Sequence, residues 1–85
     1  MASYSVLIKR SAAKELEAVP QKDREKLVEK IQGLAENPRP TRSEKLAGND
    51  KYRIRQGVYR VLYEIDDAAI VVVVVRVAHR REVYR

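Results

Sequence analysis

The basic side chains between residue 51 and the C-terminus are mostly arginines, and they fall in two short segments. The first segment holds Lys51, Arg53, Arg55 and Arg60, and the second holds Arg76, Arg80, Arg81 and Arg85. An arginine presents a planar fork that matches a phosphate group, and it stays charged at any working pH. This pattern predicts a polyanion as a binding partner; a basic face kept for solubility is the alternative.

The spacing of these residues could place them on one surface. Because side chains alternate along a strand, Arg53 and Arg55 would share a face, and a hairpin would add Arg60 to it. The C-terminal segment could bring four more groups nearby: His79, Arg80, Arg81 and Tyr84. Such a set could hold a phosphodiester, stabilise its pentavalent transition state and transfer protons without a metal. In RNA the adjacent 2′-hydroxyl would be the nucleophile.

The composition excludes several other kinds of protein. The chain has 85 residues, a formal net charge of +6, no cysteine and one histidine. These counts predict a single domain over residues 1–85, with no disulfide, no metal site and no cofactor. The longest apolar run, residues 68–75, is far shorter than the roughly 20 residues that span a bilayer. The first residues of the sequence contain no apolar stretch like that of a secretory signal. We therefore expect a soluble cytoplasmic protein without a membrane partner.

Two helices are predicted in the first half of the chain. Residues 4–9 read as a first strand, after which Ser11 would cap a helix that ends at Pro20. A second helix follows, with apolar residues at helical spacing from Leu27 onward, and residues 37–40 (NPRP) stop it. Its other face mixes lysine with acidic residues, which indicates a solvated face with i,i+4 charge pairs and no ligand site.

The second half of the chain predicts three strands. Residues 52–56 alternate apolar and basic side chains, Gly57 allows a tight turn, and residues 58–65 form the next strand. After a turn at Asp66 and Asp67, the valine run within residues 70–77 is typical of a central strand covered on both faces. The order is β-α-α-β-β-β, an α+β fold in which a helical hairpin packs on a mainly antiparallel four-stranded sheet.

Three segments resemble a known family. They are residues 45–55 (KLAGNDKYRIR), the strand at 59–63 (YRVLY) and the ending at 77–85 (VAHRREVYR). Together with the element order, they resemble the RelE/ParE toxin superfamily of type II toxin–antitoxin systems, and the ending resembles the RelE branch. The resemblance implies the RelE-like microbial RNase fold and an endoribonuclease that cleaves messenger RNA in the ribosomal A site.

The resemblance also implies roles for individual residues. Arg60 would contact the scissile phosphate, Arg80 would stabilise transition-state charge, and Tyr84 would stack on a base and orient the 2′-hydroxyl. His79 would donate or accept a proton. The implied RNA-binding set is Lys51, Arg53, Arg55, Arg81 and Arg85. Because arginine stands here where other members carry lysines, His79 or Tyr84 must carry more of the proton transfer, and the sequence does not choose between them.

The partners are implied in the same way. They are messenger RNA on the ribosome and a cognate antitoxin protein, with operator DNA bound only through the toxin–antitoxin complex. One alternative is a ParE-like inhibitor of DNA gyrase with no catalysis of its own. Another is a basic nucleic-acid-binding module or an inactive relative of the toxins.

Overall fold

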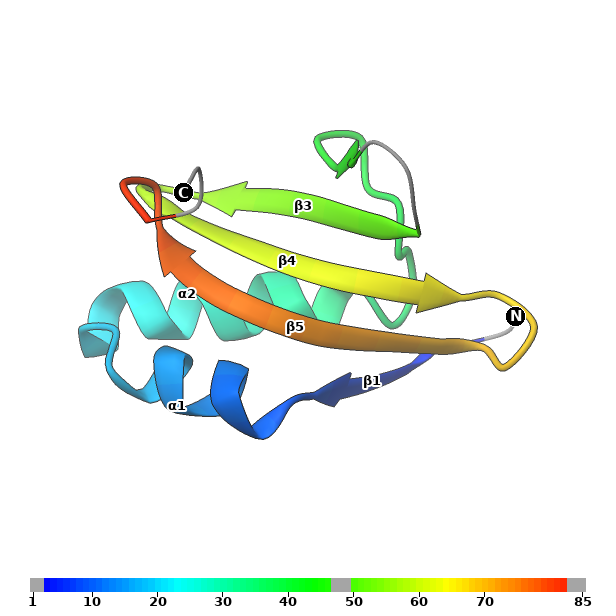
Figure 1. Ribbon diagram of the computed structural model, residues 1–85, viewed down its shortest axis with the longest axis horizontal. Helices are drawn as coiled ribbons and strands as arrows, with labels where there is room; N and C mark the ends of the chain where they lie inside the picture. The colour runs from blue at the N-terminus through cyan, green and yellow to red at the C-terminus, as the bar shows by residue number, and fades with distance from the viewer. Residues whose placement is uncertain (1–2, 47–49, 83–85) are drawn as a thin grey trace.

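The computed structural model describes residues 3–46 and 50–82. In chain order, the elements are β1 (Ser5–Ile8), α1 (Arg10–Glu17), α2 (Gln21–Gly33), β2 (Glu44–Lys45), β3 (Lys51–Gln56), β4 (Tyr59–Asp66) and β5 (Val71–His79). The two helices lie on one face of a single sheet, as Figure 1 shows. The predicted α+β architecture with a helical hairpin on a mainly antiparallel sheet is confirmed.

The sheet has five strands, whereas the sequence predicts four. Its order is β1-β5-β4-β3-β2, with β1 parallel to β5 and the other pairs antiparallel. The additional strand, β2, consists of two residues, Glu44 opposite Arg53 and Lys45 opposite Tyr52. A strand of two residues shows no alternation of its own, and its segment reads as a polar turn region.

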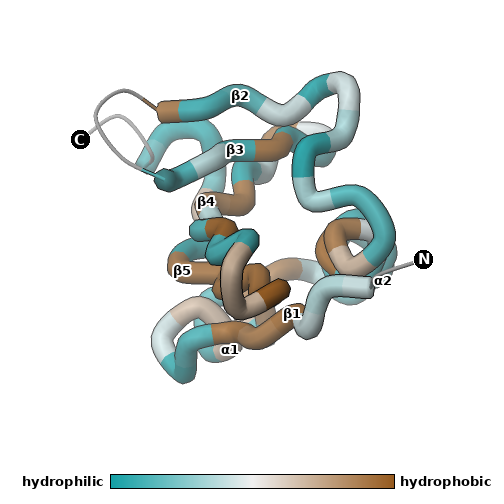
Figure 2. Tube along the Cα trace, turned by 90° about the vertical axis from the view of Figure 1, so that its right-hand side faces the viewer, coloured by the Kyte–Doolittle hydropathy of each residue, from teal (hydrophilic) through white to brown (hydrophobic). Residues whose placement is uncertain are grey.

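The core lies between the sheet and the helices. Val61, Tyr63 and Ile65 of β4 face the helices and are buried. They pack with buried valines of β5 and with Leu27 and Ile31 of α2. In Figure 2 the hydrophobic colour gathers along β1 and β5, while β2 is hydrophilic. The face of the sheet that points away from the helices has no second layer among the described residues.

The valine run is central in the sheet, but it is covered on one face only, which corrects the prediction. Val72 and Val74 are fully buried, whereas Val71, Val73 and Val75 are half-buried. The strand lies between β1 and β4, so neighbouring side chains shelter the outer valines without a covering layer. Beyond Ile8, where β1 ends, Glu15 of α1 accepts a hydrogen bond from the Val77 amide (2.8 Å) and so protects the edge of β5.

The first helix begins earlier than predicted and has no side-chain cap. Lys9 precedes it in an extended conformation, and its amide donates to the Val74 carbonyl (2.9 Å). Pairing with β5 therefore continues to the residue before the helix, and Ser11 falls inside the first turn. Pro20 directly precedes α2, in agreement with the predicted boundary.

Candidate functional site

Arginines from three strands meet on the face of the sheet that points away from the helices. Arg55 of β3 lies directly opposite Arg60 of β4. In the neighbouring row, Arg53 lies opposite Leu62, which in turn lies opposite Arg76 of β5. We call the surface formed by Arg53, Arg55, Arg60 and Arg76 the arginine face. The shared face of Arg53, Arg55 and Arg60 follows from strand alternation, as the sequence predicts.

A single carboxylate, that of Glu44 on β2, holds two of these arginines. Its Oε1 accepts a hydrogen bond from Arg53 Nη2 at 3.1 Å and lies 3.5 Å from Arg55 Nη2. The Arg53 side chain is 12% exposed, so its guanidinium is held against the sheet, whereas the Arg55 side chain is 53% exposed. Exposed ion pairs contribute about 0–1 kcal/mol each, so Glu44 holds these two groups only weakly.

Arg76 joins the arginine face because of an irregularity in the sheet. The register between β4 and β5 shifts between Leu62 and Tyr63. Tyr63 pairs with Val74 and Leu62 pairs with Arg76, so one residue of β5 has no partner in β4. Simple alternation from Val72 and Val74 would turn Arg76 toward the core. The shift places it on the outer face instead, where its Nε lies 3.7 Å from Glu15 Oε2. The sequence does not predict that Arg76 belongs to this face, because a bulge in a run of valines gives no signal.

His79 lies on the opposite face of the sheet from Arg60, which corrects the prediction that one surface holds both. Its cross-strand partner is Tyr59, and the two rings meet edge to face with centroids 5.7 Å apart. Tyr59 packs against the core on the helix side. The imidazole Nδ1 accepts a hydrogen bond from the Arg81 amide (3.2 Å), which ties the ring into the turn after β5.

Of the remaining predicted residues, Arg80 and Arg81 lie at the same end of the sheet as His79, Lys51 lies at the other end, and two fall outside the described residues. The Arg80 amide donates to the Val58 carbonyl (2.7 Å), which places this residue beside the turn between β3 and β4. Arg80 and Arg81 are both exposed. Lys51 lies at the far end of β3, 4.0 Å from Glu64. Tyr84 and Arg85 fall outside the described residues.

A polar network at the other end of the sheet anchors the loop that leads to β2. Arg39 donates to both carboxylate oxygens of Asp67 (2.7 and 3.2 Å), to the Tyr52 hydroxyl (3.1 Å), and lies over the Tyr52 ring. Tyr4 also donates to Asp67 (2.7 Å). The hydrogen bonds from Arg39 and Tyr4 lower the pKa of Asp67, and the bond to Asp67 raises the pKa of Tyr4.

Buried Tyr63 completes this anchor. Its hydroxyl donates to the Pro38 carbonyl (2.7 Å), and its ring stacks on that of Tyr52 with centroids 5.8 Å apart. Burial raises the pKa of Tyr63 to about 12. These contacts hold the segment before β2 and thereby position Glu44 beside the arginines. Local sequence patterns do not predict these contacts, because they join residues 11 to 63 positions apart in the chain.

The described residues include no group of three or more histidine, cysteine, aspartate or glutamate side chains that could hold a metal ion. Within residues 3–46 and 50–82, both helices are too short or too polar to cross a membrane. What the arginine face offers chemically is several fixed positive charges, spaced by the strand register and open to a large ligand. Such a surface suits the negatively charged backbone of a nucleic acid.

The chain is similar in sequence to toxins of type II toxin–antitoxin systems. Residues 6–84 match the family described as "ParE toxin of type II toxin-antitoxin system, parDE". The toxin RelG of Mycobacterium tuberculosis is 38% identical over 87 residues, which cover 96% of this chain and 97% of that protein.

Solved structures of similar proteins share the fold over nearly the whole chain. The toxin–antitoxin complex RelBE2 from Mycobacterium tuberculosis contains a chain with a TM-score of 0.82 and 32% identity, covering 96% of this chain and 97% of that one. The archaeal RelE–RelB complex from Pyrococcus horikoshii contains a chain with a TM-score of 0.85 and 28% identity, covering 94% of this chain and 98% of that one. The isolated E. coli RelE toxin has a TM-score of 0.80 and 31% identity, covering 91% of this chain and 84% of that one.

Fold and sequence together define a toxin of a type II toxin–antitoxin system. The chain belongs to the RelE/ParE toxin superfamily, and the relatives named above are RelE-type toxins.

Proposed function

We propose that this toxin is an endoribonuclease that cleaves messenger RNA in the ribosomal A site and so inhibits translation. The observation that supports it most is the direct pairing of Arg55 with Arg60 on an open sheet face. Like charges placed opposite one another weaken a sheet. A phosphodiester suits this pairing, because its anionic oxygens can accept hydrogen bonds from two neighbouring guanidinium groups.

The charges on this face and the chemistry of RNA support the reaction that we propose. The 2′-hydroxyl loses its proton and attacks the adjacent phosphorus, the bond from phosphorus to the 5′-oxygen breaks, and the 5′-oxygen takes up a proton. The products are a 5′-hydroxyl and a 2′,3′-cyclic phosphate, which water can open to a 3′ phosphate. Arg60 holds the scissile phosphate and Arg80 stabilises the charge of the transition state or leaving group. We assign the binding of the flanking RNA backbone to Lys51, Arg53, Arg55, Arg81 and Arg85.

We assign proton transfer to Tyr84, and we assign His79 a structural role in the turn after β5. The Tyr59–His79 ring contact lies on the helix side of the sheet, whereas the phosphate would lie on the arginine face. His79 instead ties the turn that presents Arg80, through its hydrogen bond from the Arg81 amide. Of the two proton carriers that the sequence offers, Tyr84 is therefore the one we place at the 2′-hydroxyl.

The partners follow from the relatives. The solved complexes of RelE-type toxins contain RelB antitoxins, and we propose that this chain binds a cognate antitoxin in the cytoplasm. Operator DNA would be bound only through that complex.

The direct test is primer extension on messenger RNA bound to ribosomes, with antitoxin-free protein and a metal chelator. Discrete cuts in the A site that vanish without ribosomes would support the proposal. An intact message, together with inhibition of gyrase supercoiling, would refute it in favour of a ParE-type inhibitor. Cuts that persist in an Arg60→Ala variant would refute the assignment of the phosphate to the arginine face.

A further inference from the structure

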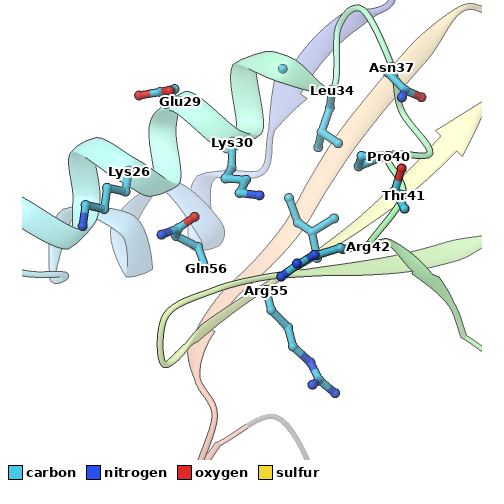
Figure 3. A pocket seen from close by; sticks show the side chains of 12 residues that line it. Lys26, Glu29, Lys30, Leu34, Asn37, Pro40, Thr41, Arg42, Arg55 and Gln56 are labelled. Carbon is cyan, nitrogen blue, oxygen red and sulfur yellow. The ribbon is translucent and has the colours of Figure 1, made fainter.

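A cleft of about 550 Å³ lies between α2 and β3, and its lining is strongly basic. Four cationic side chains border it: Lys26, Lys30, Arg42 and Arg55. Figure 3 shows Lys30 extending from α2 toward Arg42, while the carboxylate of Glu29, the acidic residue in the lining, points away from the space between helix and strand. The cleft therefore concentrates positive charge without an acidic group aimed into it.

The lysines of α2 are not balanced by ion pairs in the part of the chain that the structure describes. Neither Lys26, Lys30 nor Arg42 takes part in a salt bridge there. Lys26 and Lys30 are four residues apart on one helix, and like charges at that spacing weaken a helix. The sequence predicts a mixed, solvated face here, but the fold places both lysines along a cleft that Arg42 borders on its other side.

The basic cleft continues onto the arginine face around the edge of β3. A second hollow, of about 450 Å³, shares Lys30, Arg42, Arg55 and Gln56 with the cleft, and Glu44 and Gly57 complete its lining. The edge of β3 is open at this point because β2 pairs only with Tyr52 and Arg53. The stem of Arg55 borders the cleft, while its guanidinium extends to the other side of the strand (Figure 3).

We propose that the cleft between α2 and β3 binds backbone phosphates of the same RNA strand that lies on the arginine face. This inference rests on the proposed function, because it extends the path of the RNA beyond the sheet. Lys26, Lys30 and Arg42 contact the phosphates. Leu34 and Ile54 give the cleft an apolar floor suited to a ribose or base. Continuity with the arginine face favours RNA over an acidic peptide, because Arg55 borders both surfaces.

The test compares short and long RNA on the full-length, antitoxin-free protein. Binding of 2′-O-methyl RNA, which lacks the nucleophile, is measured by fluorescence anisotropy with oligonucleotides of about 6 and about 14 nucleotides, within the range of known single-strand sites. The variant is the double substitution Lys30→Gln and Arg42→Gln. The matched control is Arg10→Gln with Lys14→Gln, which removes the same charge from exposed positions of α1 that do not line the cleft.

We expect the double variant to bind the long RNA about tenfold more weakly and the short RNA less than about twofold more weakly. The slope of log K against log salt for the long RNA should fall by about 1.4, since each lost phosphate contact removes about 0.7. The control should bind both RNAs within about twofold of wild type. An equal loss for both lengths, or in the control, would overturn the inference, because it would indicate general electrostatics.

Two further outcomes separate this inference from the proposed function. If the short RNA binds and added length brings no affinity, the cleft does not bind RNA, while the proposed function stands. If neither RNA binds and ribosome-bound messages stay intact, both proposals fail. A poly-glutamate peptide of matched length is the competitor. If it binds more tightly than the RNA and loses affinity in the double variant, the cleft is a site for an acidic protein segment and the inference is overturned.

Discussion

The position of His79 gives a sharp test of which face of the sheet performs the chemistry. Its ring packs on Tyr59 at the helix side, and Arg60 lies on the other side of the same sheet. We predict that His79→Ala lowers stability but leaves cleavage on ribosomes nearly unchanged. Arg60→Gln should do the reverse and lower cleavage by about 10²–10³-fold, the usual cost of removing one donor to transition-state charge.

The size of the His79 effect follows from its contacts. The edge-to-face pair with Tyr59 contributes about 0.5–1.5 kcal/mol, and the hydrogen bond from the Arg81 amide about 0.5–1.5 kcal/mol. Their loss lowers the free energy of unfolding by about 1–3 kcal/mol. A domain of about 5 kcal/mol stability would keep about 2 kcal/mol and remain about 97% folded. Cleavage should therefore fall by less than about threefold.

The assay is the rate of A-site cleavage between about pH 5.5 and 8, alongside urea denaturation of each variant. A catalytic imidazole would give the pH–rate profile a limb that disappears in His79→Ala. We expect wild type and His79→Ala to share one profile, and His79→Phe to recover part of the lost stability through its ring. If His79→Ala matched Arg60→Gln in activity, lost the limb and kept its stability, our reasoning would be refuted.

Three further predictions concern stability and charge. Gly57 has φ of +61° at a two-residue turn, so Gly57→Ala should lower the free energy of unfolding by about 1–2 kcal/mol. Gly33→Ala in α2 should raise the free energy of unfolding by about 0.4–1 kcal/mol. Neither new Cβ would contact another atom, and urea denaturation compares the two variants. Glu44→Gln should strengthen RNA binding by up to about fivefold, because it releases two arginines from an ion pair of about 0–1 kcal/mol; unchanged anisotropy titrations would contradict this. Because the pKa of Tyr63 is raised, the fold favours the neutral phenol, and the contribution of Tyr63 to the free energy of unfolding is complete below about pH 10 and is lost as pH rises toward about 12. A Tyr63→Phe variant should lack this part of the pH dependence of unfolding.

The sequence predicts those parts of the site that depend on local alternation. Arg53 and Arg55 share a face because they are two residues apart in one strand, and Arg60 joins them because Gly57 permits a tight hairpin. Alternation fails where the sheet is irregular. The register shift opposite Leu62 turns Arg76 outward and leaves His79 on the helix side. A bulge arises from tertiary pairing and has no signature within a run of valines.

The same distinction holds for the fold. The helical hairpin and the consecutive strands follow from periodicity and from Pro20, whose backbone favours the start of a helix. The salt bridge from Arg39 to Asp67 joins loops that are 28 residues apart, and each loop alone reads as a polar turn. The strand β2 exists only because β3 offers it an edge. Pairings of this kind depend on the folded molecule, so no local pattern in the sequence predicts them.

The parallel pairing of β1 with β5 has a consequence for the order of folding. Ser5 lies opposite Val71, so the first strand made finds its partner only after nearly the whole chain has been synthesised. The strands β3, β4 and β5 are joined by short turns and can pair early, because closing a short loop costs little entropy. The arginine face thus forms from local hairpins, and β1 arrives last. Until β1 pairs, the valine-rich edge of β5 is open to other chains, so the pairing of β1 competes with aggregation during folding.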